Sequence, residues 1–592
     1  MNLYANYTQD CQFRVSQTLS AGWWVEANWA VRVGVDHCML HVIAGYYPVG
    51  YNAFVILCMV RRIFLMKALT SAAHTKGYLY FTVFCAGMTS LAIEFGASRL
   101  LGNTFGTSNL VWASIIGLIL IYLTVGYFIG GRWADRSPKL QTMFGILAWG
   151  GFTAGLVPFI SRPVLRMAAE AFDQLRVGIL FGSFTAVLIL FVVPVTLLGT
   201  ISPFAIRLAI VDSRQAGRIS GQIYAISTLG SFIGTFLPVL VLIPLVGTTY
   251  TFLTFSLFLT LVALVGLLIT AGWKRIILWI WMPVVLCILG IFWGGGLIKN
   301  TAGEIYEKES AYNYIQVLEV DGYRYLRLNE GQGIHSQWHA TDLNYGGPWQ
   351  EFLAGPFFNP PPYQPAQVKN MAIIGLAAGT VARQATAVFG DIPIDGFEID
   401  PAIIAVGRQY FDMNMPNLNA VAEDGRVGLE RSKQTYSLIA VDAYRPPYIP
   451  PHLTTQEFFK LCRGHLLGDG VLVVNVGRSP IDRTLIDQIA STVQTVFPSV
   501  YVVDVPGSFN TMIYATVQPT QFTNLQANLD LLKANADSPG LLMISMQVAI
   551  ENKKDTPPMN IVYTDDWSPI EWVTNSMVLS YVLFGDMSQI GH

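Results

Sequence analysis

The chain has 592 residues, of which 53% are hydrophobic and only 12% are charged. A chain this long and this apolar is neither a single domain nor an ordinary soluble protein, so part of it must lie in a membrane. The net charge is -2 and no basic stripe with interleaved aromatic residues occurs, which argues against nucleic acid as a partner and favours polar small molecules.

Apolar runs long enough to cross a bilayer follow one another from Gly77 to about Ile298. They predict seven spans with short loops between them: Tyr78–Leu100, Leu110–Ile129, Thr142–Ile160, Val177–Leu198, Ile219–Leu242, Phe252–Thr270 and Ile276–Phe292. An eighth candidate span, Cys38–Val60, is interrupted by Pro48 and Gly50. The first two predicted domains are therefore an N-terminal region (residues 1–76), which holds that candidate, and a transmembrane helical domain (residues 77–298).

Lysine and arginine gather in alternate loops, which the positive-inside rule assigns to the cytoplasm. These loops hold Arg61, Arg62 and Lys67; Arg132, Arg136 and Lys139; Arg207, Arg214 and Arg218; and Lys274 and Arg275. An odd number of spans after Lys76 would place everything beyond Trp293 outside the cell, whereas a nucleoside-dependent enzyme is expected inside. We predict a multi-pass protein of the cell membrane and leave the side of its soluble part open.

Polar and small residues of the apolar half have two interpretations. Glu94 and Arg99 lie near one end of the first span, where a charge suggests a transport site but a long side chain also snorkels to the interface. Two pairs of glycines four residues apart are typical of helix packing: Gly126/Gly130 and Gly230/Gly234. We favour packing over transport.

The composition changes after Gly294-Gly-Gly296 to charged, alternating sequence. Tyr314–Val320 and Tyr323–Leu328 alternate between apolar and polar residues around Asp321-Gly322, which predicts a β-hairpin. Residues 299–365 are therefore predicted to form a small β subdomain and a linker.

A glycine-rich turn after a buried strand is the centre of the remaining sequence. Met371–Ile374 predicts a parallel strand, and the following Gly375–Thr380 supplies small residues that let a backbone approach a ligand closely. A second strand, Ile392–Phe397, delivers Glu398 about 20 residues later, where a carboxylate can bind ribose hydroxyls. The glycines alone suit a packing turn equally well, but the acidic strand end favours a nucleoside-binding βαβ unit within residues 366–592.

Two further predicted strands end at Asp424 and Asp442. Strands that alternate with helices predict a doubly wound parallel sheet, whose ligands bind at the carboxyl ends of the strands. A single acidic strand end is explained by capping of the next helix. Three in succession, at Glu398, Asp424 and Asp442, favour a site for a ligand with ribose hydroxyls, an adenine amine and a cationic centre.

Over Glu309 to about Gln518 the sequence resembles the spermidine synthase family, aminopropyltransferases built on a class I methyltransferase fold. The resemblance rests on Glu309–Tyr312, Tyr345, Ile374–Thr380, Glu398–Asp400, Glu423–Arg426, Asp442–Tyr444 and Leu453–Phe459. With the apolar half attached, the whole chain is similar to membrane-fused spermidine synthase-like proteins. The resemblance implies an N-terminal multi-pass α-helical bundle and a C-terminal Rossmann-type α/β domain preceded by the small β subdomain.

The resemblance also implies a donor, either decarboxylated S-adenosylmethionine or S-adenosylmethionine. Glu398 would hold its ribose and Asp424 its adenine. The backbone of the turn would pass close to the sulfonium, through Gly375, Ala378 and Gly379.

A sulfonium is a good leaving group, so the protein has only to position an amine and remove its proton. By the resemblance, Asp442 and Tyr345 are the candidates for that work. No metal is expected: His335 and His339 lie four residues apart, but the surrounding sequence predicts strand and loop, and no third ligand is near.

The sequence departs from the family pattern on the acceptor side. Ala378 stands where the family has an aspartate that grips the polyamine, and Arg445 replaces a second aspartate that is usually the base. Gly346 follows Tyr345 where the family has glutamine. A dicationic polyamine therefore loses much of its anionic clamp, and Arg445 would repel it.

We therefore predict a membrane-anchored, aminopropyltransferase-like protein that transfers a group from an S-adenosyl-type donor to an unidentified acceptor. The alternatives are a catalytically inactive ligand-binding or scaffold module, and a transporter with a regulatory soluble domain. Asp565 and Asp566 are candidate replacement carboxylates, or caps for a helix that begins near Pro569. The expected partners are a nucleoside, an amine and the lipid bilayer, and a homo-oligomer is left open.

Overall fold

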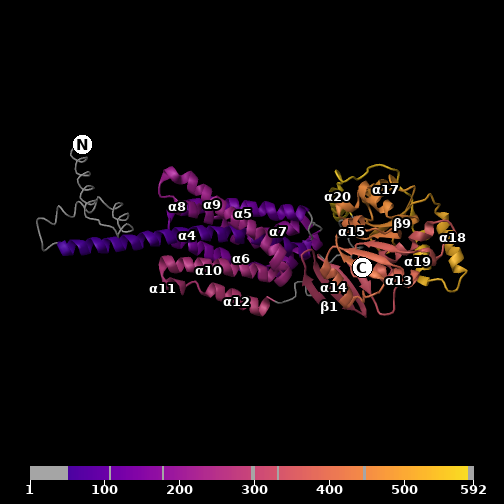
Figure 1. Cartoon of the computed structure of the whole chain (residues 1–592), viewed down its shortest axis with the longest axis horizontal. Helices are drawn as coiled ribbons and strands as arrows, with labels where there is room; N and C mark the ends of the chain where they lie inside the picture. Colours follow the sequence, from indigo (N-terminus) through magenta and orange to yellow (C-terminus); the bar gives the residue numbers. More distant parts are fainter. Residues whose placement is uncertain are drawn as a thin grey trace, which may run out of the picture. The chain divides into compact units, whose positions relative to one another are not determined.

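The computed structural model describes residues 51–105, 109–175, 179–294, 301–329, 333–444 and 449–584 (Figure 1). The first part of the candidate span Cys38–Val60 and the predicted acceptor-side residue Arg445 lie outside these residues. The described elements are long helices first, then a four-stranded sheet, then an eight-stranded sheet with helices. The fold class predicted from the sequence is confirmed.

Five helical stretches of the described chain are long and apolar enough to cross a membrane: Lys76–Asn103, Val111–Arg136, Leu140–Leu165, Phe184–Ala209 and Ser213–Ala271. They lie in α4 (Tyr51–Phe105), α5 (Asn109–Arg136), α6 (Leu140–Leu175), α7 (Ile179–Gly199) with α8 (Ile201–Ala209), and α9 (Ala216–Leu237) with α10 (Ile243–Ala271). Length and composition are the basis of this assignment.

The number of long apolar helices differs from the seven or eight predicted spans. Ile219–Leu242 and Phe252–Thr270 fall in one apolar stretch of 59 residues, but Gly247 between them has a non-helical backbone (φ +80°, ψ 170°) and separates two helices, in agreement with the two predicted spans. The predicted span Ile276–Phe292 is wrong in extent, because its regular helix, α12, covers only Trp281–Trp293. At 1.5 Å per residue, α12 is about 20 Å long, short of the roughly 30 Å of a hydrocarbon core.

The glycine pairs lie where helix backbones approach one another closely. A Cβ added to Gly230 or Gly234 of α9 would lie 2.0 Å from the carbonyl oxygen of Phe84 or Met88 of α4. The pair on α5 is packed in the same way against the end of α7 and the residue after it: Gly126/Gly130. Only glycine permits this spacing, so the interpretation as packing faces is confirmed.

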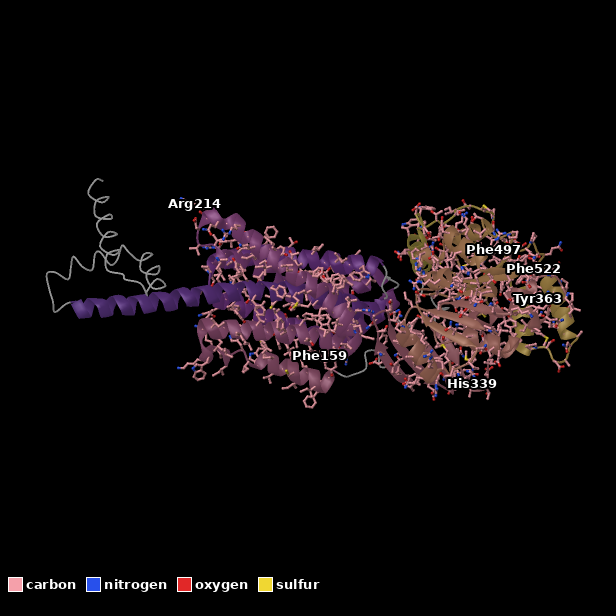
Figure 2. The ribbon with its side chains drawn as sticks, viewed as in Figure 1. Phe159, Arg214, His339, Tyr363, Phe497 and Phe522 are labelled. Carbon is pink, nitrogen blue, oxygen red and sulfur yellow. The ribbon has the colours of Figure 1, made fainter. Side chains whose placement is uncertain are left out.

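The small sheet is antiparallel in the order β1-β2-β3-β4. Its strands are β1 (Glu304–Glu309), β2 (Tyr314–Val320), β3 (Tyr323–Leu328) and β4 (Ile334–Trp338). The predicted hairpin is confirmed, since Asp321 and Gly322 join β2 to β3 with φ of +52° and +82°. Positive φ at both central residues is the geometry of a type I′ turn. His339, labelled in Figure 2, follows β4 and stacks on Tyr323 with ring centroids 4.4 Å apart.

The large sheet has the order β12-β10-β11-β9-β8-β5-β6-β7. Its strands are β5 (Met371–Ile374), β6 (Ile394–Glu398), β7 (Leu418–Ala422), β8 (Tyr436–Val441), β9 (Leu466–Gly477), β10 (Ser499–Asp504), β11 (Asn510–Thr516) and β12 (Lys553–Lys554). The five strands from β9 to β7 run parallel, whereas β11, β10 and β12 pair antiparallel. The predicted parallel sheet therefore has an antiparallel extension.

Helices cover both faces of this sheet (Figure 1). Side chains alternate along β5, so Met371 and Ile373 join one hydrophobic core while Ala372 and Ile374 join the other. The first core includes η3 (Pro348–Phe358), α13 (Thr380–Phe389), α18 (Thr523–Lys533) and α19 (Gly540–Glu551). The second includes α15 (Gly425–Arg431), α16 (Gln456–Gly464), α17 (Thr484–Gln494) and α20 (Ile570–Phe584).

Candidate functional site

The carboxyl ends of β8, β5, β6 and β7 meet at one edge of the sheet. Ile374 of β5 pairs with Phe397 of β6 on one side and with Val441 of β8 on the other, and Glu398 pairs with Ala422 of β7. The chain runs from β5 to β6 and β7 in one direction and then returns to β8, so the order reverses between β5 and β8. Ligands of doubly wound sheets bind at such a switch point.

The turn after β5 has the backbone geometry that close approach requires. Gly375 has φ of +88°, and a Cβ there would lie 2.5 Å from the carbonyl oxygen of Asp442 at the end of β8. Gly379 has φ of +86° and precedes α13. Between them, Ala377 also has a positive φ, +49°, which is uncommon for a residue with a side chain. Gly375 and Gly379 are therefore required by backbone geometry.

Ala378 is engaged within the protein. Its amide donates to the hydroxyl of Ser336 on β4 at 2.9 Å. Its side chain is buried in a hydrophobic cluster with Ile403 and Val406 of α14 (Pro401–Tyr410). The small sheet and α14 therefore enclose this position, which was predicted to lie beside the donor.

Glu398 ends β6 and is only 8% exposed. One carboxylate oxygen accepts from the amide of Ala377 at 3.0 Å, and the other accepts from the amide of Asp400 at 3.1 Å. Each oxygen retains acceptor capacity for a hydroxyl group. Burial raises the pKa of Glu398 to about 7, against the opposing effect of these backbone hydrogen bonds. The side chain is thus a buried acceptor that titrates near neutral pH.

Asp424 follows β7 and caps α15. Its Oδ1 accepts from the amides of Arg426 and Val427 at 3.0 and 3.1 Å. Its Oδ2 lies 2.9 Å from Nε2 of His452, and this hydrogen bond lowers the pKa of Asp424. Helix capping therefore accounts for one oxygen, and the second is shared with a histidine from another segment.

Asp442 follows β8, on the other side of the glycine turn. Its Oδ1 accepts from the side-chain amide of Asn475 on β9 at 2.8 Å, and Asn475 in turn accepts from Asn510 at 3.0 Å. Burial raises the pKa of Asp442 to about 7, although the residue retains some solvent exposure. A carboxylate with this pKa is suited to exchange a proton at neutral pH.

Tyr345 lies in the segment before η3. Its hydroxyl accepts from the amide of His339 at 3.3 Å, and its ring meets Trp349 edge-on with centroids 6.4 Å apart. Within the described residues, no hydrogen bond joins Tyr345 to Asp442. The structure thus brings Glu398, Asp424 and Asp442 to one edge and gives Tyr345 other neighbours.

Two polar residues of the surroundings were not singled out from the sequence. Asn475 positions Asp442, and its signal was a lone amide at the end of the apolar run Val471–Val474. Gln350 is buried in η3, and its side-chain oxygen accepts from the amide of Gly346 at 3.3 Å. A glutamine thus lies one turn beyond the position where Gly346 replaces one.

Asp565 is not a free carboxylate. It forms a two-pronged ion pair with Arg426, with both N···O distances 2.7 Å, and accepts from the hydroxyl of Thr455 at 2.7 Å. Arg426 holds the pKa of Asp565 down at about 2. The residue therefore neither supplies an unpaired carboxylate nor caps α20, which begins at Ile570.

A hollow of about 340 Å³ adjoins this ion pair. It is lined by Arg426, Pro451, His452, Thr455, Asp565 and Ser568. One of these residues, His452, is hydrogen-bonded to Asp424. Glu398, Asp442 and the glycine turn do not line it.

A doubly wound sheet with a positive-φ glycine turn and an acidic residue at the end of the next strand is typical of α/β proteins that bind nucleosides. Residues 361–527 match the family model of the spermine/spermidine synthase domain. The C-terminal part of the chain is therefore similar to the spermine/spermidine synthase domain.

Relatives of this domain are found among bacterial proteins. A "Probable polyamine aminopropyl transferase" of Bifidobacterium longum is 30% identical over 284 residues, which cover 45% of this chain and 61% of that protein. The chain thus spans about three fifths of that relative's length. A "Polyamine aminopropyltransferase" of Vibrio vulnificus is 28% identical over 281 residues, covering 45% of this chain and 89% of that protein. Among solved structures, a probable spermidine synthase from Corynebacterium glutamicum has a TM-score of 0.34 and 17% identity, covering 44% of this chain and 97% of that chain.

Proposed function

We propose that this protein is a membrane-anchored transferase that binds an S-adenosyl-type donor at the edge formed by β8, β5, β6 and β7. The observation that carries the proposal is the buried carboxylate of Glu398 beside the positive-φ turn at Gly375 and Gly379. The names of the relatives favour decarboxylated S-adenosylmethionine as the donor and an amine as the acceptor. The five long apolar helices support the anchor.

In this proposal, the β6 and β7 half of the edge holds the nucleoside. Each carboxylate oxygen of Glu398 accepts one hydrogen bond from a backbone amide and can accept another from a ribose hydroxyl. Ile399, which is 44% exposed beside this carboxylate, provides apolar surface for the ribose and the base. Asp424 offers Oδ2 to the adenine amine once His452 releases it. These three residues lie at the end of β6 or within two residues after β6 and β7, which are neighbouring strands.

The β8 half carries out the transfer. The nitrogen lone pair of the acceptor attacks the propyl carbon bonded to the sulfonium, the carbon–sulfur bond breaks, and its electron pair returns to sulfur as methylthioadenosine leaves. Asp442 takes up the proton that the new ammonium gives away, and its pKa near 7 suits that task. Asn475 holds the carboxylate in place. Tyr345 is retained as a candidate for binding the acceptor.

One observation favours a second function, a nucleoside-binding module without turnover. The site has no acidic side chain in its glycine turn, because Ala378 fills that position within an apolar cluster. A dicationic polyamine would leave an ammonium group without a charged partner there, which is costly in a closed site. If transfer occurs, its acceptor is therefore expected to be other than a dicationic polyamine.

Release of methylthioadenosine separates the two functions. The full-length protein in detergent is incubated with decarboxylated S-adenosylmethionine, with and without mono-, di- and polyamines, and methylthioadenosine is measured by mass spectrometry. Release that depends on one amine supports the transferase. Nucleoside binding without release under any acceptor supports the binding module, and a chain that binds no nucleoside contradicts both.

A further inference from the structure

Hydrogen bonds to a buried carboxylate join the loop between β1 and β2 to the candidate site. Asp400, two residues after Glu398, is 1% exposed. Its Oδ2 accepts from the hydroxyl of Ser310 at 2.5 Å and from the side-chain amide of Asn313 at 3.0 Å. Its Oδ1 accepts from the amide of Ala402 at 3.0 Å and so caps α14. One carboxylate oxygen of Asp400 therefore binds the loop between β1 and β2, and the other binds the start of α14.

The donors on the small sheet are themselves fixed. The hydroxyl oxygen of Ser310 accepts from the amides of Tyr312 and Asn313 at 3.1 and 2.8 Å. Its single proton has two acceptors, Asp400 Oδ2 at 2.5 Å and the carbonyl oxygen of Asn313 at 3.1 Å, and the shorter contact is the one to Asp400. The side-chain oxygen of Asn313 accepts from Asn329, which ends the predicted hairpin, at 3.0 Å. Ser310, Asn313 and Asn329 are all buried, so each of these bonds would be costly to lose.

A second contact from the small sheet reaches the glycine turn. Ser336 of β4 accepts from the amide of Ala378, as described above. The next residue, Gln337, exchanges two hydrogen bonds of 2.9 Å with the hydroxyl of Thr380, one through its amide and one through its carbonyl oxygen. The turn is thus held from β4 as well as from β6.

We propose that the small antiparallel sheet is a working part of the donor site, in which Ser310 and Asn313 are positioning residues that fix Glu398 through Asp400. The inference rests on the proposed function, because it concerns the residue assigned to the ribose. The path is short: Ser310 and Asn313 bind the carboxylate of Asp400, and the amide of Asp400 binds the carboxylate of Glu398.

The substitution Asp400→Asn distinguishes positioning from simple capping. The asparagine side chain has only one acceptor oxygen, which can either cap α14 or accept from the small sheet. Its amide nitrogen then faces the donors on the other side, where no hydrogen bond can form. Asparagine is as good a cap as aspartate, so the oxygen is expected to stay on α14. Asp400→Asn therefore cuts the link to Ser310 and Asn313 while it preserves the helix start.

The test is methylthioadenosine binding, measured by calorimetry on the full-length protein in detergent. Ser310→Ala is expected to weaken binding about tenfold, and Asp400→Asn by at least as much. Asn528→Ala is the matched control, because Asn528 is fully buried and holds the amide of Tyr363 and two carbonyl groups between η3 and α18, away from the edge. This control is expected to lower thermal stability and to leave the affinity within twofold of the unmodified protein.

Two further readouts identify the route of the effect. In a Glu398→Gln background, Ser310→Ala is expected to have little additional effect on affinity, because both changes act on the same contact. Burial is the main cause that raises the pKa of Glu398, and the negative charge of Asp400 adds to it. Asp400→Asn is therefore expected to move the pH midpoint of binding downward.

The outcomes separate the inference from the proposed function. If the unmodified protein binds methylthioadenosine but Ser310→Ala and Asp400→Asn bind it equally well, the inference is overturned and the proposed function stands. If Asn528→Ala weakens binding as much as they do, general loss of stability explains the result and the inference is also overturned. If the unmodified protein does not bind methylthioadenosine at all, the proposed function fails and the inference fails with it.

Discussion

The two halves of the sheet edge are built differently. On the β6 and β7 half, Glu398 and Asp424 are held by backbone amides, and Asp400 ties this half to the small sheet. On the β8 half, Asp442 is held by the side chain of Asn475 among the described residues. Ala378 offers no carboxylate. The half proposed for the donor thus depends mainly on main-chain geometry, whereas the half proposed for the acceptor depends on single side chains and is easier to change.

The largest effect is expected where the two halves touch, at Gly375. Gly375→Val places a branched side chain at φ of +88°, with its Cβ 2.5 Å from the backbone of Asp442. We expect methylthioadenosine binding to be lost and the free energy of unfolding to fall by about 3 kcal/mol or more, since strain and clash add. Calorimetry and thermal unfolding measure the two quantities.

Gly390→Val is the matched control for that substitution. Gly390 ends α13 with φ of +80°, but a Cβ there meets no atom within 4 Å. It shares the backbone cost without the clash, so it is expected to lose stability and to keep nucleoside binding. Equal binding by the two variants would show that the close approach at Gly375 is unimportant.

Asp442→Asn is expected to change turnover without changing nucleoside affinity, because Asp442 belongs to the β8 half. The new amide oxygen can still accept from Asn475, but the group that takes up the proton is removed. Turnover with any productive acceptor should therefore fall at least 100-fold, within the usual range for a general base. The affinity for methylthioadenosine, which is held by the other half, should change less than twofold. A parallel loss of both quantities would mean that the halves are not separate.

The pH dependence of stability is the next effect in size. Glu398 and Asp442 have folded pKa values of about 7, above the values of 4.5 and 3.8 expected when the chain unfolds. Between these limits the folded protein keeps protons that the unfolded chain has released, so stability falls as pH rises toward 7. Asp424 and Asp565 have lowered pKa values and act in the opposite direction, at pH below 3.8.

Thermal unfolding at pH 5 and pH 8 measures this effect. The melting temperature of the α/β domain should be lower at pH 8, and Glu398→Gln and Asp442→Asn should each reduce the difference. A difference that persists unchanged in both variants would assign the pH dependence to other groups.

The smallest effect is expected at Asp565, outside both halves. Its side chain is 43% exposed and that of Arg426 is 23% exposed. An ion pair of this kind contributes about 1 kcal/mol or less. Asp565→Asn should therefore lower the melting temperature by a few degrees at most and leave nucleoside binding and turnover unchanged. Loss of turnover would instead show that the C-terminal segment supplies a carboxylate to the reaction.

Local patterns in the sequence predicted the fold and the sheet edge at which the three acidic strand ends lie. The alternation on both sides of Asp321-Gly322 predicted the two strands of the hairpin with their observed bounds. The acidic residues after apolar runs predicted the carboxyl end of the parallel strands. The separation of Ile219–Leu242 from Phe252–Thr270 was also predicted, and Gly247, whose backbone is non-helical, lies between them. The extent of α12 was not predicted, because the apolar run around it is longer than the regular helix.

Contacts between distant parts of the chain were beyond the reach of the sequence. Ser310 and Asp400 are 90 residues apart, and Arg426 and Asp565 are 139 apart. Periodicity and spacing describe neighbours along the chain, so neither pair had a signal. For the same reason, the catalytic role of Tyr345 could be predicted only from the family resemblance. Its position relative to Asp442 depends on how η3 packs, which local sequence patterns do not describe.

The central claim is that Glu398 binds a nucleoside, and calorimetry with methylthioadenosine on the full-length protein tests it most directly. We expect the unmodified protein to bind and Glu398→Gln to bind at least 30-fold more weakly, because hydrogen bonds to a carboxylate are about twice as strong as neutral ones. Glu551→Gln, a substitution of an exposed acid on α19, should bind as the unmodified protein does. Equal affinity of Glu398→Gln and the unmodified protein would contradict the account.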